Sequence, residues 1–196
     1  MFVDIFNTEK KYNIIYADPP WKYGSKQPFR SGGVRFHALE KEYPTLSTKE
    51  MSEWDIKRIA SKDCALFMWA TDSHIYDALC LMKAWGFKYV TVAFVWRKIT
   101  KNGKQVSNLG AWTMKNCEIC LLGTRGTMRK YKKSNSVQQL FSCERTKHSK
   151  KPDCTRDYIK QLFGNLPCIE LFARQHTDGW DCWGNEIEEY KEKENV

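Results

Sequence analysis

Blocks of apolar residues alternate with amphipathic segments along the chain. Five apolar runs have the length of strands and are rich in β-branched and aromatic residues, which favours buried strands. They cover residues 12–16, 64–70, 89–96, 117–123 and 168–173. Three segments carry apolar residues at helical spacing, and these are residues 51–59, 75–85 and 158–163. Strands that alternate with helices in this way predict a doubly wound α/β sheet.

Boundary residues support the three helices. Ser47 or Thr48 can cap the first helix, and Gly86 ends the second. Pro152 suits the first turn of the third helix, which Gly164 ends. Hydroxyl side chains satisfy amide groups at helix starts, proline is tolerated in a first turn, and glycine adopts the conformation that ends a helix.

The strands at 89–96 and 117–123 are joined without a clear helix, which predicts an antiparallel pair at the edge of an otherwise mostly parallel, twisted sheet. A short strand is expected at 137–143, another just before Gly184, and a frayed, charged helix over 188–195. The 196 residues suffice for one core, so a single domain over residues 1–196 is predicted.

An unusual tetrad, Asp18-Pro19-Pro20-Trp21, follows the first strand. The two prolines prevent the strand from continuing and fix the backbone. In open α/β sheets, ligands bind at the carboxyl ends of strands. The simpler interpretation is a Pro-Pro turn with a capping aspartate.

The tetrad suits methyl transfer to the amino group of adenine, a poor nucleophile whose lone pair is delocalised. The Asp18 carboxylate can accept one N–H, and a proline-held carbonyl can accept the other. Such preorganised acceptors stabilise charge that develops in the transition state. Trp21 offers a face on which a base can stack, worth about 1–3 kcal/mol, and the base would have to leave a duplex to reach it.

Composition is that of an ordinary soluble protein, with 42% apolar and 28% charged residues. No apolar run reaches the length of a membrane span and no signal-peptide pattern is present, so a cytoplasmic location is expected. Of eight cysteines, only Cys117 and Cys120 have C-x-x-C spacing, without a second pair at zinc-ribbon distance. Reduced thiols in the core are therefore expected, and no metal.

The net charge of +9 is unevenly distributed. Residues 97–160 hold 16 Lys and Arg against 4 Asp and Glu, whereas the remainder holds 16 against 19. A solvated face explains any single cluster, but three clusters with interleaved aromatics favour binding of nucleic acid through its phosphates. The candidate phosphate contacts are Arg97, Lys98, Arg129, Lys130, Lys132 and Lys133.

A polar stretch, residues 22–45, follows the tetrad and contains several Gly and Pro. Loops of this length in a compact domain are usually lids or binding loops. Arg30, Arg35 and His37 could meet phosphates there, and Tyr43 could line the adenine site. A disordered insertion without function is the alternative.

Two later landmarks suggest a cofactor site. Lys151 precedes Pro152 at a predicted helix start, where anions bind well; a plain surface lysine is the alternative. The strand at 168–173 leads through a polar loop to Gly184, and Asn185 or Glu186 could bind ribose hydroxyls. A G-x-G-x-x-G motif is absent from the sequence, which disfavours a dinucleotide enzyme.

These three landmarks in this order resemble the MT-A70-type adenine-N6 methyltransferases, whose motifs are Asp-Pro-Pro-Trp, a His-Lys-Pro-like loop, and Glu-Leu-Phe-Gly-Arg running into Gly-Asn. They correspond here to residues 18–21, 148–152, 170–174 and 184–185, so the match spans nearly the whole chain. The resemblance implies a Rossmann-like methyltransferase that uses S-adenosylmethionine, with the catalytic motif ahead of the cofactor-binding strand.

The resemblance also implies roles for individual residues. Asp18, Pro19, Pro20 and Trp21 would form the catalytic motif, with Asp18 also contacting the cofactor, and Tyr43 would be a lid tyrosine near the target base. The implied cofactor contacts are Lys151 for the carboxylate, Arg174, Asn185 and Glu186 for the ribose, and His176 nearby. The chain departs from the usual pattern at Ala173, Thr177 and Glu186, and an insertion leaves a choice between Lys150 and Lys151, of which Lys151 adjoins Pro152.

The compact chain is similar to bacterial or phage members, which act on DNA, so methylation of adenine N6 in DNA is the predicted function. RNA as the substrate, a catalytically silent nucleic-acid-binding subunit, and a protein or small-molecule methyltransferase are the alternatives. A homodimer is left open, because the sequence does not determine the oligomeric state.

Overall fold

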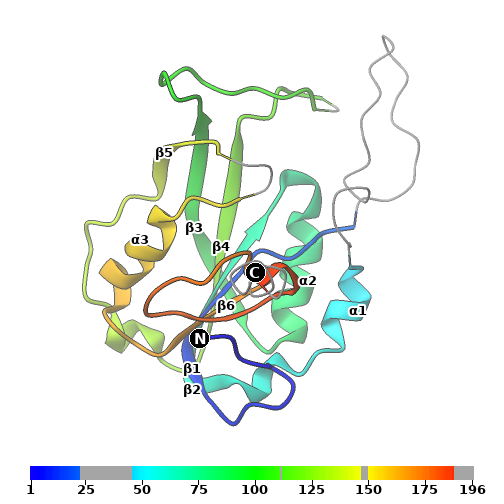
Figure 1. Cartoon of the computed structure of the whole chain (residues 1–196), viewed down its shortest axis with the longest axis vertical. Helices are drawn as coiled ribbons and strands as arrows, with labels where there is room; N and C mark the ends of the chain where they lie inside the picture. The colour runs from blue at the N-terminus through cyan, green and yellow to red at the C-terminus, as the bar shows by residue number, and fades with distance from the viewer. Residues whose placement is uncertain (23–45, 111, 147–149, 188–196) are drawn as a thin grey trace, which may run out of the picture.

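A seven-stranded sheet forms the centre of the computed structural model, which describes residues 1–22, 46–110, 112–146 and 150–187 (Figure 1). The strand order is β5-β3-β4-β2-β1-β6-β7. The strands are β1 (Tyr12–Ala17), β2 (Ala60–Ala70), β3 (Lys88–Ile99), β4 (Cys117–Arg125), β5 (Leu140–Glu144), β6 (Cys168–Leu171) and β7 (Asp181–Trp183).

The sheet is mostly parallel, as predicted. In its described part, β4 alone runs antiparallel to its neighbours β2 and β3, while the other pairings are parallel. The predicted antiparallel pair β3–β4 is therefore present. It lies one strand in from the edge, because β5 pairs with the second half of β3, from Val95 to Ile99.

Helices cover both faces of the sheet (Figure 1). The helices are α1 (Thr48–Ser52), α2 (Ile75–Ala84) and α3 (Cys154–Phe163), with short 3-10 turns η2 (Ile56–Arg58), η3 (Asp72–His74), η4 (Met128–Tyr131) and η5 (Asn185–Ile187). One core cluster joins α1 and α2 to residues such as Leu66, and the other joins α3 to residues such as Phe67. Burial on both faces explains why the strands read as continuous apolar runs.

The first predicted helix, over residues 51–59, is divided into α1 and η2. Ser47 caps α1 through a reciprocal pair of hydrogen bonds with Glu50, so the predicted start is confirmed. The chain leaves the helix at Glu53, and the Trp54 ring packs against Phe172 at 5.5 Å between centroids. Tertiary packing of this tryptophan accompanies the break, which helical spacing alone does not reveal.

Phe172 shortens the predicted strand at 168–173. Its φ of 60° is left-handed, so the strand β6 ends at Leu171 and the chain turns away. Few non-glycine residues adopt this conformation, which is strained for a bulky side chain. The expected helix at 188–195 lies outside the described residues.

The parallel strands all end at one edge of the sheet, here called the carboxyl edge, and β4 begins there, since Ile119 pairs with Ala70. Loops after parallel strands converge at this edge. The tetrad after β1, the segment before α3 and the first residues of β4 therefore meet at the carboxyl edge. Among the described helices, none is long and apolar enough to cross a membrane.

Candidate active site

Asp18, Glu118 and Lys151 meet at the carboxyl edge, although Asp18 and Lys151 are 133 positions apart in the chain. Lys151 Nζ lies 2.8 Å from Asp18 Oδ2 and 3.2 Å from Glu118 Oε2. The three side chains are only 20%, 11% and 15% exposed for Asp18, Lys151 and Glu118, respectively. One ammonium group therefore bridges two largely buried carboxylates, and the three residues come from different parts of the chain: the end of β1, the start of β4 and the segment before α3.

Lys98, near the end of β3, adds a second ammonium group. It bonds to Glu118 Oε1 and lies over the Trp96 ring, 5.2 Å from its centroid. Lys151 lies in the same way over Trp69, at 5.9 Å. Two acids and two bases form a charge-balanced group, the charged quartet of Asp18, Glu118, Lys98 and Lys151. Aromatic faces attract such cations and help to fix their positions.

Burial and neighbouring charges shift the pKa values in opposite directions within the quartet. Burial raises the pKa of Asp18, with a further increase from Glu118, against the lowering effect of Lys151. Burial also acts to raise the pKa of Glu118, but Lys151 and Lys98 outweigh it and the net shift is downward. The pKa of Lys151 is raised, because Asp18 and Glu118 outweigh the effect of its burial. The same set of neighbours thus shifts the pKa of Asp18 upward and that of Glu118 downward.

The tetrad is fixed by hydrogen bonds on both sides. Trp21 N donates to Pro19 O at 2.9 Å, and Leu46 N donates to Pro20 O at 3.0 Å. The Trp21 indole donates to Trp69 O at 3.2 Å and stacks on His74 with 5.7 Å between centroids. Trp21 is only 6% exposed, and one face of its ring is covered by His74.

A second ionic cluster surrounds the start of α3 and the end of β6. Arg156 Nη1 lies 3.0 Å from Glu170 Oε2, and its Nη2 contacts Asp153, which also accepts from Gln175 Nε2 at 3.1 Å. Burial raises the pKa of Glu170 to about 7, and the charge of Asp18 contributes. This cluster holds the second and third landmarks of the sequence against each other.

Similarity to known proteins decides the family. The MT-A70 family model matches residues 12–186. The chain belongs to the MT-A70 family. A type II methyltransferase, M.MunI from Mycoplasma sp, is 38% identical over 193 residues, which cover 93% of this chain and 80% of the relative.

Other MT-A70 relatives are more distant and longer. The N(6)-adenine-specific methyltransferase METTL4 of Mus musculus is 30% identical over 93% of this chain and 39% of its own length. The N6-methyladenosine RNA methyltransferase MTA1 of Pyricularia oryzae is 25% identical over 97% of this chain and 51% of its own length. The predicted family and its Rossmann-like fold are thereby confirmed.

The structure brings together some of the MT-A70 site residues predicted from the sequence and separates others. Asp18, Pro19, Pro20, Trp21 and Lys151 lie around the charged quartet. Arg174 is half-buried, and its charge lowers the pKa of Asp18. Asn185 begins η5, after β7 ends at the same edge. Arg30, Arg35, His37 and Tyr43 lie outside the described residues, as does the side chain of Glu186.

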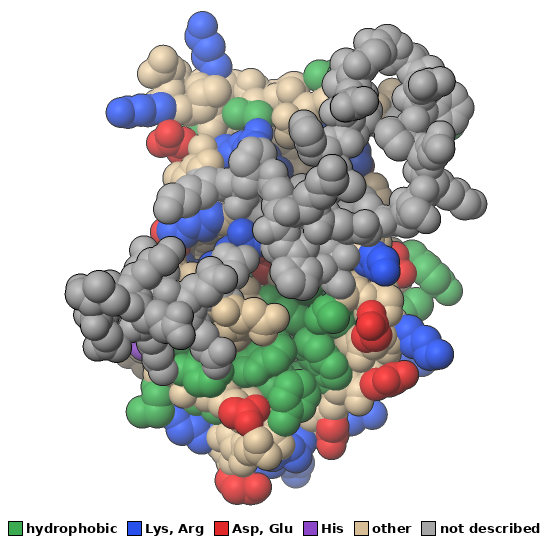
Figure 2. Space-filling model, turned by 45° about the vertical axis from the view of Figure 1, so that its right-hand side comes forward, with side chains coloured by type: hydrophobic (Ala, Val, Ile, Leu, Met, Phe, Trp, Pro, Cys, Tyr) green, Lys and Arg blue, Asp and Glu red, His purple; other side chains and the backbone are tan. Residues whose placement is uncertain are grey.

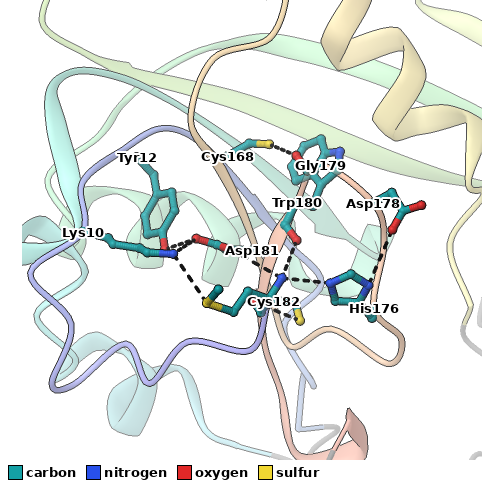
Figure 3. Close-up of polar contacts among 10 residues, drawn as sticks. Lys10, Tyr12, Cys168, His176, Asp178, Gly179, Trp180, Asp181 and Cys182 are labelled. Carbon is teal, nitrogen blue, oxygen red and sulfur yellow. Dashed lines mark hydrogen bonds and ion pairs between the residues drawn. The ribbon is translucent and has the colours of Figure 1, made fainter.

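His176 lies away from the quartet, among the residues drawn in Figure 3. Its Nε2 is 2.8 Å from the Met1 amino group, and its Nδ1 is 3.9 Å from Asp178. With Tyr12 and Cys168, the first residues of β1 and β6, His176 lines a cavity of about 540 Å³. These residues belong to the opposite end of the sheet, the amino edge, because the loop after β6 returns there before β7 begins.

Four of the six predicted phosphate contacts also lie at the amino edge. Arg129 and Lys130 lie in η4, and Lys132 and Lys133 follow it. The turn η4 comes just after β4, whose last residue, Arg125, pairs with Cys64 in the first half of β2. Lys130 pairs with Asp63 there at 2.5 Å. Of the other two, Lys98 belongs to the quartet, and Arg97 is exposed at the carboxyl edge, where it donates to Ser142. The antiparallel direction of β4 causes this separation.

Glu118 is the site residue that sequence reasoning missed. The only signal was a carboxylate inside an apolar strand, Cys117–Gly123, which is unfavourable unless the carboxylate is paired. Lys98 was assigned to phosphate, whereas its ammonium group is turned inward to Glu118. Within the described part of the chain, no group of three His, Cys, Asp or Glu could hold a metal ion, and no disulfide joins the cysteines.

Four aromatic rings form a partly exposed cluster beside the end of β6: Phe6, Trp54, Phe172 and Trp183. Phe6 is 51% exposed, and the centroids of neighbouring rings lie 5.3–5.8 Å apart. Figure 2 shows hydrophobic side chains gathered between charged ones on the side of the molecule that carries α1 and α2. Trp183 directly precedes Gly184 and Asn185, so the cluster adjoins the third landmark.

Proposed function

We propose that this protein transfers the methyl group of S-adenosylmethionine to the N6 amino group of adenine in DNA. The observation that carries the proposal is the position of Asp18, a carboxylate held at the end of β1 by an ion pair with Lys151. The proposal deepens the family assignment, since the family alone does not fix the nucleic acid.

Asp18 has the properties that the amino group requires. Its carboxylate accepts hydrogen bonds and, because burial raises its pKa, it is a stronger acceptor than an exposed aspartate. An N–H of the target adenine bound to Asp18 has its electrons drawn toward nitrogen. Positive charge that develops there is stabilised by the fixed carboxylate, which needs no reorganisation at the moment of reaction.

The carbonyl groups of Pro19 and Pro20 supply the second acceptor. Each accepts one backbone hydrogen bond, from Trp21 and Leu46 respectively, and a carbonyl oxygen has two lone pairs. These bonds fix the direction of both oxygens, so either can accept the other N–H of the amino group. Trp21 anchors this backbone to β2 through its indole and provides a flat wall beside it.

Residues around the start of α3 and the end of β7 fit the cofactor. The Thr155 hydroxyl is fully buried and lacks a hydrogen-bond partner in the described structure, which marks a polar position suited to a ligand. Lys151 supplies a fixed positive charge nearby for a carboxylate. In this proposal Asn185 and Arg174 bind the ribose hydroxyls, and the aromatic cluster packs against the adenine ring. When bound, S-adenosylmethionine supplies an electrophilic methyl group.

The rest of the quartet positions Lys151 and Asp18. Glu118 draws Lys151 toward β4 while Lys98 keeps Glu118 charged, so the ammonium of Lys151 is held from two sides. Without such support, two buried carboxylates would repel each other and one would take up a proton.

DNA is favoured over RNA by the 38% identical type II methyltransferase, of which this chain covers 80%. The RNA methyltransferase relative is matched at 25% identity over half its length, so RNA is the second candidate.

The test is incubation with S-adenosylmethionine labelled in its methyl group and three matched substrates: duplex DNA, the same DNA strand alone, and RNA of the same sequence. Nucleosides from each digest are separated, and label is expected in N6-methyladenine from DNA. Label in RNA alone would show that the substrate is RNA and not DNA. Absence of label from all three would contradict the proposal, and absence of cofactor binding in calorimetry as well would favour the silent subunit.

A further inference from the structure

A long connection joins β3 to β4 at the carboxyl edge, beside the charged quartet. The described residues of this connection, 100–110 and 112–116 and here called the arm, extend sideways above the sheet in Figure 1. It is held by its own backbone, with Asn108 and Lys115 exchanging hydrogen bonds of 2.8 and 2.7 Å. The two halves of the arm are therefore held together by backbone hydrogen bonds, and its side chains project from this paired backbone.

Three large apolar side chains are exposed on the arm. Trp112 is 98% exposed, Leu109 60% and Met114 52%. A tryptophan ring is the largest apolar surface that a side chain offers, and clusters of such residues in water mark interaction sites. In the described structure Trp112 is the most exposed of the large hydrophobic residues. The arm thus has the composition of a binding element.

The charge of the arm indicates the kind of partner. Residues 97–116 contain five Lys and Arg and no Asp or Glu. Lys101 and Lys104 are exposed. Exposed aromatic and aliphatic side chains interleaved with lysines suit nucleic acid, whose bases stack on rings and whose phosphates pair with cations. A purely apolar protein surface would leave these lysines without partners.

The arm is also tied to the catalytic tetrad. Lys115 Nζ lies 2.9 Å from Asp72 Oδ1 and 3.3 Å from Ser73 Oγ, both in η3. His74, the last residue of η3, stacks on Trp21. A substrate bound at the tetrad therefore lies within the part of the molecule from which the arm projects.

We propose that the arm opens duplex nucleic acid, with Trp112 entering the base stack in place of the adenine that turns toward Asp18. This inference rests on the proposed function. A base inside a duplex cannot reach a buried carboxylate, so it must leave the stack, and an inserted apolar side chain offsets the lost stacking. Leu109 and Met114 flank Trp112 and support it against the neighbouring bases. Trp112 is a positioning residue, since it does not touch the reacting amino group.

The test compares Trp112→Ala with the unchanged protein on a paired and an unpaired form of one target sequence. Methylation of duplex DNA should fall on the order of tenfold to a hundredfold, as expected from the loss of one stacking interaction. Methylation of the single strand, and of a duplex with an abasic site opposite the target adenine, should change less than about twofold. Trp112→Phe should recover much of the duplex activity.

Tyr76→Ala is the matched control, because Tyr76 is 78% exposed on α2 and lies outside the arm. It should leave both activities unchanged. Equal loss on paired and unpaired substrates, or no loss on the duplex, would overturn the proposal. A shift of the protein from dimer to monomer in Trp112→Ala, with both activities lowered together, would assign the arm to contact between copies instead.

A second readout separates this proposal from the proposed function. The fluorescence of 2-aminopurine at the target position rises when the base leaves the stack, whether or not a methyl group is transferred. If the unchanged protein raises the fluorescence and Trp112→Ala does not, the arm opens duplexes even where the methylation assay fails. If neither raises it, the proposal is wrong even where the single strand is methylated.

Discussion

Glu118→Gln tests whether the charged quartet controls the basicity of Asp18. The change keeps the size of the side chain and removes its negative charge. Because Glu118 contributes to the raised pKa of Asp18, the pKa of Asp18 should fall in the variant. The change also releases Lys151 from its 3.2 Å contact with Glu118, so its ammonium can approach Asp18 more closely. Both effects act in the same direction.

The size of the shift follows from the geometry. Both carboxylates bond to the same Lys151 nitrogen, so their nearest oxygens lie at most about 6 Å apart, and an effective dielectric constant of about 20 gives a repulsion of about 3 kcal/mol. This repulsion corresponds to about two pKa units for Asp18. Because Lys151 and Lys98 screen it, the expected fall in the pKa of Asp18 is about one unit.

The measurement is a carbon-13 NMR titration of the side-chain carboxyl groups, with the Asp18 signal assigned from Asp18→Asn. It needs neither cofactor nor substrate. Lys98→Met should act in the opposite direction, because Glu118 then leaves the group with a net negative charge and the pKa of Asp18 rises. Glu144→Gln, an exposed carboxylate at the end of β5, is the control and should leave Asp18 unchanged. A pKa of Asp18 that rises or stays constant in Glu118→Gln would refute the reasoning.

Three further predictions concern turnover, pH and backbone packing. Asp18→Ala should lower methyl transfer about a hundredfold or more in single-turnover experiments while cofactor binding in calorimetry persists, because a preorganised group that acts on the transition state is lost; unchanged turnover would remove Asp18 from the mechanism. The folded pKa of Glu170 is raised to about 7, so the stability that it contributes is complete below about pH 4.5 and is lost as the pH rises to 7. Glu170→Gln should therefore flatten the free energy of unfolding over this window in urea titrations, and an unaltered slope would contradict the shifted pKa. Gly184→Ala should destabilise the protein by about 1–3 kcal/mol, because the added Cβ would lie 2.2 Å from Ala173 O. If the variant melts at the same temperature as the unchanged protein, residue 184 does not lie this close to Ala173.

Local sequence signals were sufficient for most elements. Apolar runs predicted the strands β1, β2, β3, β4 and β6 within a few residues, and Ser47 correctly marked the start of α1. The other two helices begin after His74 and Asp153, neither of which makes a side-chain cap, and Pro152 lies just before α3 and not in its first turn. Strands β1 and β2 can be recognised without tertiary information, because nearly all of their side chains are buried on one face of the sheet or the other and their sequences are therefore continuously apolar. The first residues of β3 are exposed, and their β-branched and aromatic side chains provide the signal instead. The tetrad, followed by the two later landmarks, also identified the family correctly.

Local signals did not determine which distant residues meet. Sequence reasoning grouped Lys98 with Arg129 and Lys133 as a basic belt, but β4 runs antiparallel and carries the residues that follow it to the amino edge. A charge count along the chain contains no information on strand direction. His176, which the resemblance implied near the cofactor, lies at the amino edge beside the Met1 amino group, because the loop after β6 returns to that edge.

The sequence by itself determined the alternation of strands and helices, the placement of Asp18 at a strand end, and membership in the MT-A70 family, because each depends on residues that are neighbours in the chain. Only the tertiary structure decided that Glu118 and Lys98 join Asp18 and Lys151. Their contacts arise from the order and direction of strands in the sheet. The partner of a buried charge can be far away in the sequence, so the pairing is determined only by the fold.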